Sequence, residues 1–200
     1  MPTAARRTAF HPLTVAAVER LCPDAAAVTF HVPADLVDVF NFRPGQFLTV
    51  RRHEGGQEQR RSYSISSPVG APPRIGVREV PGGAVSGWLI HEVRPGDVVE
   101  VQPPAGSFTP DLDSPGRHVL VAAGSGITPV LSIAWSVLAD GKSEAVLLYG
   151  NRRSDTVMFA DEVADLKDKF LGRVQVVNLL SREAQEVELF NGRLDAAKLG

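Results

Sequence analysis

Arg61, Tyr63 and Ser64 lie within four residues of one another in the run RRSYSISSP, residues 60–68. The run alternates as a β-strand does, and side chains two residues apart on a strand point to the same face. An arginine there can give paired hydrogen bonds to a diphosphate, and a neighbouring tyrosine can lie flat on an aromatic ring system. The serine adds a small hydroxyl group. These residue types favour a site for an aromatic cofactor with a diphosphate. The alternative, a core tyrosine beside a solvated arginine, stays open.

A glycine-rich turn, GSGITP at residues 124–129, follows an apolar run and precedes a helical pattern. Glycines let backbone N–H groups approach an anion, and the amino end of a helix favours negative charge. We therefore predict that Gly124, Gly126 and Thr128 contact a ligand, with a plain strand-to-helix turn as the alternative. The turn is not the G-x-G-x-x-G dinucleotide fingerprint, because residue 129 is proline, and it is not a G-x-x-x-x-G-K phosphate loop.

The first half of the chain, residues 1–112, is rich in short β-like runs separated by proline, glycine and acidic turn signals. This spacing predicts a six-stranded antiparallel barrel or a sandwich. We expect strands at residues 13–21, 26–32, 45–52, 60–66, 74–80 and 97–103. One helical pattern, residues 84–93, interrupts the series.

The second half, residues 113–200, alternates as β-α-β-α-β, which predicts a doubly wound α/β domain with a parallel sheet. Strands are expected at residues 118–124, 145–151 and 173–181, helices at 127–140 and 158–170, and the start of another helix at 192–200. The first of these strands is continuously apolar, as in buried parallel strands. Three strands make a small sheet for a nucleotide domain, so we expect the chain to be a truncated piece of a longer protein.

Composition narrows the possible partners and chemistry. The chain has 200 residues, a formal net charge of −2 and 44% hydrophobic residues, which suits a globular protein without nucleic acid or an anionic membrane as its main partner. Residues 1–15 lack a long apolar core, so we expect no signal peptide and a cytoplasmic location. The single cysteine, Cys22, cannot supply an iron–sulfur cluster. We expect no metal site and, without a basic neighbour, no reactive role for Cys22.

Three segments in this order resemble the ferredoxin–NADP reductase family. The run RSYS at 61–64, followed by Ile65, resembles its R-x-Y-S flavin motif, and the segment GGAVSGWL at 82–89 resembles its G-x-x-S segment. The turn at 124–129 is similar to its G-x-G-I-T-P nicotinamide segment. The resemblance spans roughly residues 10–195. It implies FAD bound at a β-barrel, a nicotinamide nucleotide bound at the parallel sheet, hydride transfer between the two, and onward transfer of single electrons.

The resemblance also implies roles for single residues. Arg61 would contact the flavin diphosphate, Tyr63 the flavin ring or ribityl chain, and Ser64 the region of flavin N5, with Thr128 near the nicotinamide. Ser64 and Thr128 are therefore the expected catalytic residues. Further cofactor contacts are expected from Ile65, Val77, Gly83, Ser86, Gly124 and Gly126.

The end of the third parallel strand carries the expected determinant of nucleotide choice. Ser181 and Arg182 resemble the pair that holds the 2′-phosphate of NADP in this family, and a guanidinium suits that charge. An acidic residue there would suit the 2′-hydroxyl of NAD, and Glu183 is next in the chain. We predict NADPH as the nucleotide. Arg152, after the second strand, is a further candidate contact, with a solvated loop charge as the alternative.

A wider set of segments resembles the reductase components of oxygenase systems within this family. These segments are FHPLTVAAVERL, FRPGQFLTV, YGNRRSDTVMFADEV and LLSRE. Complete members carry a plant-type 2Fe–2S domain after the nucleotide domain, and this chain lacks that domain and the family's C-G-P motif. The implied partners are NADPH, an iron–sulfur domain or ferredoxin, and an oxygenase component. Two alternatives stay open: a stand-alone ferredoxin or flavin reductase, and a flavin-binding relay subunit that does not use nicotinamide.

Overall fold

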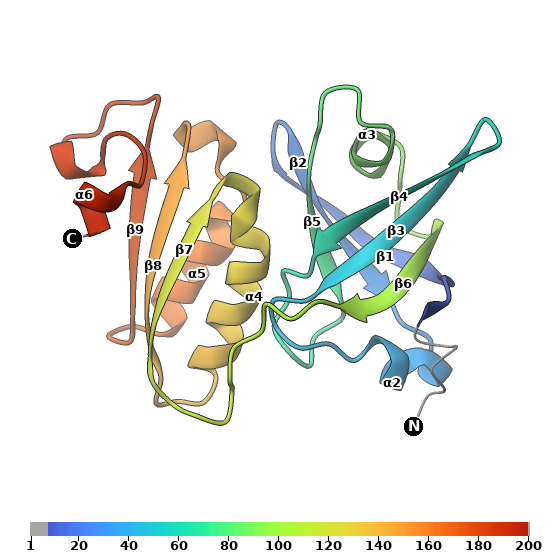
Figure 1. Cartoon of the computed structure of the whole chain (residues 1–200), viewed down its shortest axis with the longest axis horizontal. Helices are drawn as coiled ribbons and strands as arrows, with labels where there is room; N and C mark the ends of the chain where they lie inside the picture. Colours follow the sequence, from blue (N-terminus) through green and yellow to red (C-terminus); the bar gives the residue numbers. More distant parts are fainter. Residues whose placement is uncertain (1–7, 200) are drawn as a thin grey trace.

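The computed structural model describes residues 8–199 as two parts, each built on a β-sheet, that lie side by side (Figure 1). Residues 1–7, which belong to the segment in which we expect no signal peptide, lie outside the described residues. Among the residues that the structure describes, no helix has the length and apolar character needed to cross a membrane.

The amino-terminal part is a six-stranded antiparallel sheet with the strand order β4-β3-β6-β1-β2-β5. The strands are β1 His11–Cys22, β2 Ala25–His31, β3 Phe47–Glu54, β4 Gln57–Ser64, β5 Arg74–Arg78 and β6 Val98–Ala105. An antiparallel bridge between Ile65 and Ile75 connects the two ends of this order, so the sheet closes into a barrel. The predicted antiparallel barrel is confirmed.

Three short helices complete the barrel: η1 Ala34–Leu36, α2 Val37–Phe40 and α3 Ala84–His91. The sequence pattern predicted α3 but neither η1 nor α2. Each of these two has at most four residues, which is too short to show a helical repeat. Leu36, Val39 and Phe40 are buried in the barrel core, so packing against the barrel supports these turns of helix.

The carboxyl-terminal part is a three-stranded parallel sheet with the order β7-β8-β9. Its elements are β7 Arg117–Ala123, η2 Gly124–Gly126, α4 Ile127–Leu138, β8 Glu144–Asn151, η3 Ser154–Thr156, α5 Ala160–Lys169, β9 Val174–Leu180, η4 Glu188–Phe190 and α6 Ala196–Leu199. The predicted β-α-β-α-β alternation is confirmed. The predicted boundary at 112/113 lies in the mostly exposed segment 106–116, between β6 and β7.

The burial of β7 differs from the prediction of a strand covered on both faces. Val119 is 67% exposed and Val121 is 49% exposed. The strand order β7-β8-β9 runs in one direction, and parallel crossovers are right-handed, so α4 and α5 lie on the same face of the sheet. The described residues therefore leave the face that carries Val119 and Val121 open.

Strand β2 is buried on both faces because it lies between the barrel core and the parallel-sheet part. Ala26 and Val28 belong to the barrel core. Ala25 and Ala27, on the other face, pack in a second cluster with Ile127 of α4. Since alanine has a small side chain, the two parts of the molecule come close together along β2.

Tyr149 of β8 gives the fold a measurable dependence on pH. Its side chain is fully buried, and its hydroxyl group lies 3.2 Å from the carbonyl oxygens of both Gly124 and Met158. Burial raises the pKa of Tyr149 from 10.0 to about 12. The neutral phenol therefore stabilises the fold fully below pH 10, and this contribution is lost as the pH rises toward about 12.

We expect Tyr149→Phe to reduce the fall in the free energy of unfolding over this alkaline range by about 2 kcal/mol, because phenylalanine does not ionise. Urea titrations at successive pH values measure this difference. Tyr63→Phe is a second test of the same effect, because burial also raises the pKa of Tyr63 to about 12. A Tyr149→Phe protein with the pH dependence of the wild type would contradict the assignment.

Candidate functional site

The second half of β4 places the cationic side chain of Arg61 and the aromatic ring of Tyr63 on the same face of the strand. Arg61 and Tyr63 pair with Val50 and Leu48 of β3 and are two residues apart. The Arg61 guanidinium is exposed and donates a hydrogen bond to the carbonyl oxygen of Arg60 at 2.7 Å. Within residues 8–199 no carboxylate lies within 4.0 Å of it. Tyr63 packs against the barrel core, and burial raises its pKa to about 12, so its hydroxyl remains a donor.

Three other residues are predicted contacts, and they differ in how much of each is exposed: Ser64, Ile65 and Val77. Ser64, the last residue of β4, is half-buried and pairs with Phe47. Ile65 and Val77 are fully buried in the barrel core. Neither Ile65 nor Val77 therefore exposes surface to a ligand in this structure.

Helix α3 packs against β4 and β5, and its amino end carries no side-chain cap. Ser86 Oγ accepts a hydrogen bond from the Val80 N–H at 3.1 Å and donates one to the Gly83 carbonyl at 3.2 Å. The Ser86 hydroxyl thus holds the loop 80–86 in place. The N–H groups of the first turn have no side-chain partner, which suits an anion such as a diphosphate.

A cleft of about 1030 Å³ lies at the carboxyl ends of β7, β8 and β9, with residues of the barrel on its other side. Four predicted site residues line it: Gly124, Arg152, Ser181 and Arg182. It also contains residues that the sequence did not indicate: Asp24, Arg78, Glu79, Asn151, Thr156 and Arg193. The ends of all three parallel strands thus meet at one site, as expected for ligand-binding sheets of this kind.

Charge in the cleft favours an anionic ligand. In the part of the chain that the structure describes, no carboxylate lies within 4.0 Å of the guanidinium groups of Arg152, Arg182 or Arg193. Asn151 is 8% exposed, and its side-chain NH₂ group has no hydrogen-bond partner among these residues. An unpaired buried donor is costly, and the three guanidinium groups without a carboxylate partner offer an anionic ligand positive charge.

The sequence contained a signal for one of the cleft residues that the sequence analysis missed, but not for two others. Asn151 ends the second parallel strand, so the rule that pointed to Ser181 applies to it equally. Arg78 and Arg193 reach the cleft through the docking of β5 and the path of the chain after β9. Neither arrangement has a periodic signal in the sequence.

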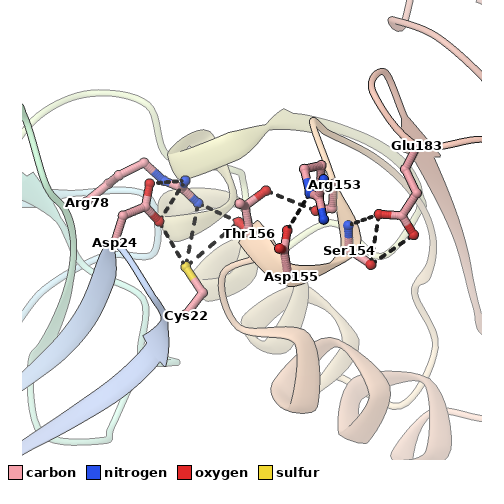
Figure 2. Close-up of polar contacts among 8 residues, drawn as sticks. All are labelled: Cys22, Asp24, Arg78, Arg153, Ser154, Asp155, Thr156 and Glu183. Atoms are coloured by element: carbon pink, nitrogen blue, oxygen red, sulfur yellow. Dashed lines mark hydrogen bonds and ion pairs between the residues drawn. The ribbon is translucent and has the colours of Figure 1, made fainter.

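One face of β5 holds the two parts of the molecule together. Arg74 forms a 3.0 Å ion pair with Glu162 of α5. Arg78 donates to the Thr156 carbonyl oxygen at 2.7 Å and pairs with Asp24 at 2.8 Å, as Figure 2 shows. These contacts fix the loop after β8 against the barrel.

Gly76 lies between these two arginines on β5 and lets the glycine turn approach the barrel. Thr128 is buried, with its hydroxyl donating to the Ser125 carbonyl at 2.9 Å. A Cβ atom on Gly76 would lie 2.7 Å from Thr128 Oγ1. Neither Thr128 nor Gly126 lines the cleft. Thr128 instead lies directly against β5 of the barrel.

Cys22 ends β1 at this junction (Figure 2). The expectation that Cys22 has no basic neighbour was wrong, because Arg78 Nη2 lies 4.0 Å from its sulfur. The two residues are far apart in the sequence and come together only in the folded chain. The thiol also donates to Asp24 at 3.2 Å. Burial, the largest influence, raises the pKa of Cys22, so the thiol stays protonated at neutral pH. The absence of a reactive role stays a prediction.

Comparison with known families assigns both parts of the chain. Residues 12–109 match the family model of the oxidoreductase FAD-binding domain. Residues 120–199 match that of the oxidoreductase NAD-binding domain. The first match covers the barrel, and the second covers most of the parallel-sheet part, including the cleft-lining strand ends.

Individual relatives give the same result. The chain is 41% identical to one of the subunits of 1,2-phenylacetyl-CoA epoxidase from Escherichia coli K12, over 96% of this chain and 55% of that protein. It is 42% identical to the ferredoxin reductase component of 3-ketosteroid-9-alpha-monooxygenase from Rhodococcus rhodochrous, over 84% of this chain and 48% of that protein. The chain thus spans about half the length of the curated relatives it matches.

A solved structure shares the arrangement of both parts. The FAD/NAD-binding domain of nitric oxide dioxygenase from Vibrio cholerae superposes with a TM-score of 0.81 and 28% sequence identity. The match covers 95% of this chain and 81% of that one.

Proposed function

Because the chain belongs to the ferredoxin reductase family of oxidoreductases, in which an FAD-binding domain precedes an NAD-binding domain, we propose that it passes electrons from NADPH through FAD to an iron–sulfur centre serving an oxygenase. FAD, when bound, supplies the redox chemistry by accepting a hydride and releasing electrons singly. The observation that carries the proposal is the arginine-lined cleft at the ends of the parallel strands, directly beside the barrel.

The barrel residues suit FAD in charge and shape. The unpaired guanidinium of Arg61 and the uncapped amino end of α3 offer donors to the diphosphate. Tyr63 offers its ring to the flavin, and Ser64 ends the same strand. In this assignment Gly83 leaves room for the Ser86 hydroxyl. A Cβ at position 83 would lie 2.6 Å from Ser86 Oγ and disturb the loop before α3.

The cleft residues suit the nicotinamide nucleotide. Arg182 and Ser181 would hold the 2′-phosphate, with Arg152 adding charge from the neighbouring strand end. Gly124 lines the cleft and takes a φ of +52°, a left-handed conformation that glycine adopts without strain. Thr128 would position the nicotinamide end of the ligand through its contact with β5.

Arg182→Ala tests the nucleotide assignment. We expect the variant to bind NADPH about 20-fold more weakly and NADH within about two-fold of the wild type, because only a charge-assisted phosphate contact is lost. Competitive binding of NADP⁺ and NAD⁺, which carry the same 2′-groups but do not reduce FAD, measures the two changes in affinity. Arg153→Ala is the matched control, since Arg153 is exposed, pairs with Asp155 at 3.1 Å and does not line the cleft. Equal weakening of the two nucleotides by Arg182→Ala would contradict the choice of NADPH.

The partner is proposed from sequence. The segments that resemble oxygenase reductases are similar to the reductase component of phenylacetyl-CoA epoxidase, and the 41% identity to a component of that enzyme supports this assignment. We propose that an iron–sulfur domain or a ferredoxin receives the electrons and passes them to that oxygenase, in phenylacetate catabolism. The cytoplasm is the proposed compartment.

Anaerobic stopped-flow mixing of the FAD-loaded chain with NADPH tests the proposed function. We expect rapid loss of the flavin absorbance at about 450 nm. A chain that holds FAD but is not reduced by NADPH or NADH would instead support the relay subunit that does not use nicotinamide.

A further inference from the structure

Glu183 directly follows Ser181 and Arg182, which line the cleft, but its own side chain does not line it. Its carboxylate is held by Ser154, in the loop after β8, as Figure 2 shows. The Ser154 N–H donates to Oε2 at 2.8 Å, and Ser154 Oγ lies 2.9 Å from each of the two carboxylate oxygens. The N–H and the hydroxyl of one serine thus fix the direction of this acidic side chain.

The backbone around this contact is fixed as well. The Ser181 N–H donates to the Asn151 carbonyl at 3.0 Å, and the Arg182 N–H donates to the Arg152 carbonyl at 2.8 Å. At its other end, the loop that carries Ser154 is held to the barrel by the hydrogen bond from Arg78 to the Thr156 carbonyl. Ser154 therefore approaches Glu183 from a loop whose two ends are both anchored.

The position of this carboxylate matters because of what it would do in the cleft. In dinucleotide-binding sheets an acidic residue near the strand end accepts hydrogen bonds from the 2′-hydroxyl of NAD. A carboxylate in that place repels a 2′-phosphate. The hydrogen bonds from Ser154, led by that of its backbone N–H, lower the pKa of Glu183, so the side chain is charged at neutral pH. Its location, rather than its protonation, then decides its effect on a ligand.

We propose that Ser154 is a positioning residue for nucleotide choice: it holds the Glu183 carboxylate outside the cleft and so leaves Arg182 to bind a 2′-phosphate. This inference rests on the proposed function and deepens it. The ligand class it assigns to the cleft is the 2′-phosphorylated adenine nucleotides. The residue that sets this preference would itself make no contact with the ligand.

The test is calorimetric binding of two probes, adenosine 2′,5′-bisphosphate and 5′-AMP, to the FAD-loaded chain. Ser154→Ala removes the hydroxyl contacts to both carboxylate oxygens but keeps the backbone N–H, so the Glu183 carboxylate is held by one hydrogen bond and can turn toward the cleft. The variant should weaken binding of the bisphosphate about five-fold and leave binding of 5′-AMP within about two-fold, because the loosened carboxylate opposes only the 2′-phosphate. The double variant Ser154→Ala/Glu183→Gln should recover the wild-type affinity for the bisphosphate, because the amide carries no charge.

Ser114→Ala is the matched control, because Ser114 Oγ donates to the Asp111 carboxylate at 2.9 Å in the segment between the two sheets. We expect no change in the affinity for either probe. Equal weakening of both probes by Ser154→Ala, or a loss that persists in the double variant, would overturn the inference and leave the proposed function intact. A wild-type chain that retains FAD but binds neither probe would overturn both.

Discussion

Gly76→Ala is expected to slow the reduction of FAD by NADPH about 100-fold and to lower the free energy of unfolding by about 2 kcal/mol. The added Cβ would lie 2.7 Å from Thr128 Oγ1, 2.8 Å from Thr128 Cγ2 and 3.0 Å from Phe159 Cε2. Thr128 and Phe159 are both buried, and threonine is stiff about χ1, so neither can withdraw easily. The glycine turn would then move away from β5, which displaces the nucleotide relative to the flavin.

Stopped-flow reduction and urea denaturation measure the two effects of Gly76→Ala separately. FAD affinity should change little, because Arg61 and Tyr63 lie on β4, and the one expected contact on β5, Val77, is buried in the barrel core. Gly87→Ala is the matched control: no heavy atom lies within 4 Å of its added Cβ, and alanine favours the helix that contains it. A Gly76→Ala protein with the wild-type rate of reduction would show that the contact with Thr128 does not position the nicotinamide.

Arg61→Ala is expected to weaken FAD binding about 50-fold, because a diphosphate would lose its charge-assisted hydrogen bonds to the guanidinium. Arg61 is exposed and is not ion-paired among residues 8–199, so its removal should leave the stability of the apo chain nearly unchanged. Quenching of flavin fluorescence on titration with the protein measures the affinity.

Arg60→Ala is the matched control for Arg61→Ala. Arg60 is the preceding residue on the same strand, but it forms an ion pair with Glu58 and lies 5.0 Å from the centroid of the Phe10 ring. Its replacement should leave FAD affinity within about two-fold of the wild type. A similar loss from both variants would mean that β4 attracts FAD only through general positive charge, and that Arg61 makes no specific contact.

The order of the strands and helices could be predicted because their signals are local. Every strand of the barrel and of the parallel sheet has its own run of alternating or apolar residues, and prolines and glycines separate the runs. The two-sided burial of β2 was also visible in principle. Ala25 and Ala27 interrupt the alternation expected of a barrel strand, and the reason is the second cluster that they join.

The site could be predicted only where topology determines position. Arg182 and Gly124 follow strand ends, and the carboxyl ends of parallel strands meet at one edge of a sheet. Arg78 contacts the loop after β8 through the docking of two sheets, which depends on side-chain fit along Gly76 and Thr128. The hydrogen bonds between Ser154 and Glu183 span 29 residues and leave no pattern in the sequence.

The central claim is that FAD binds on the β4 face beside Tyr63, and titration of the purified chain with FAD tests it most directly. We predict saturable binding of one FAD per chain, with a flavin absorbance band at about 450 nm that remains after gel filtration. Tyr63→Ala should lose this band while remaining folded. A well-folded wild-type chain that stays colourless after incubation with excess FAD would contradict the account.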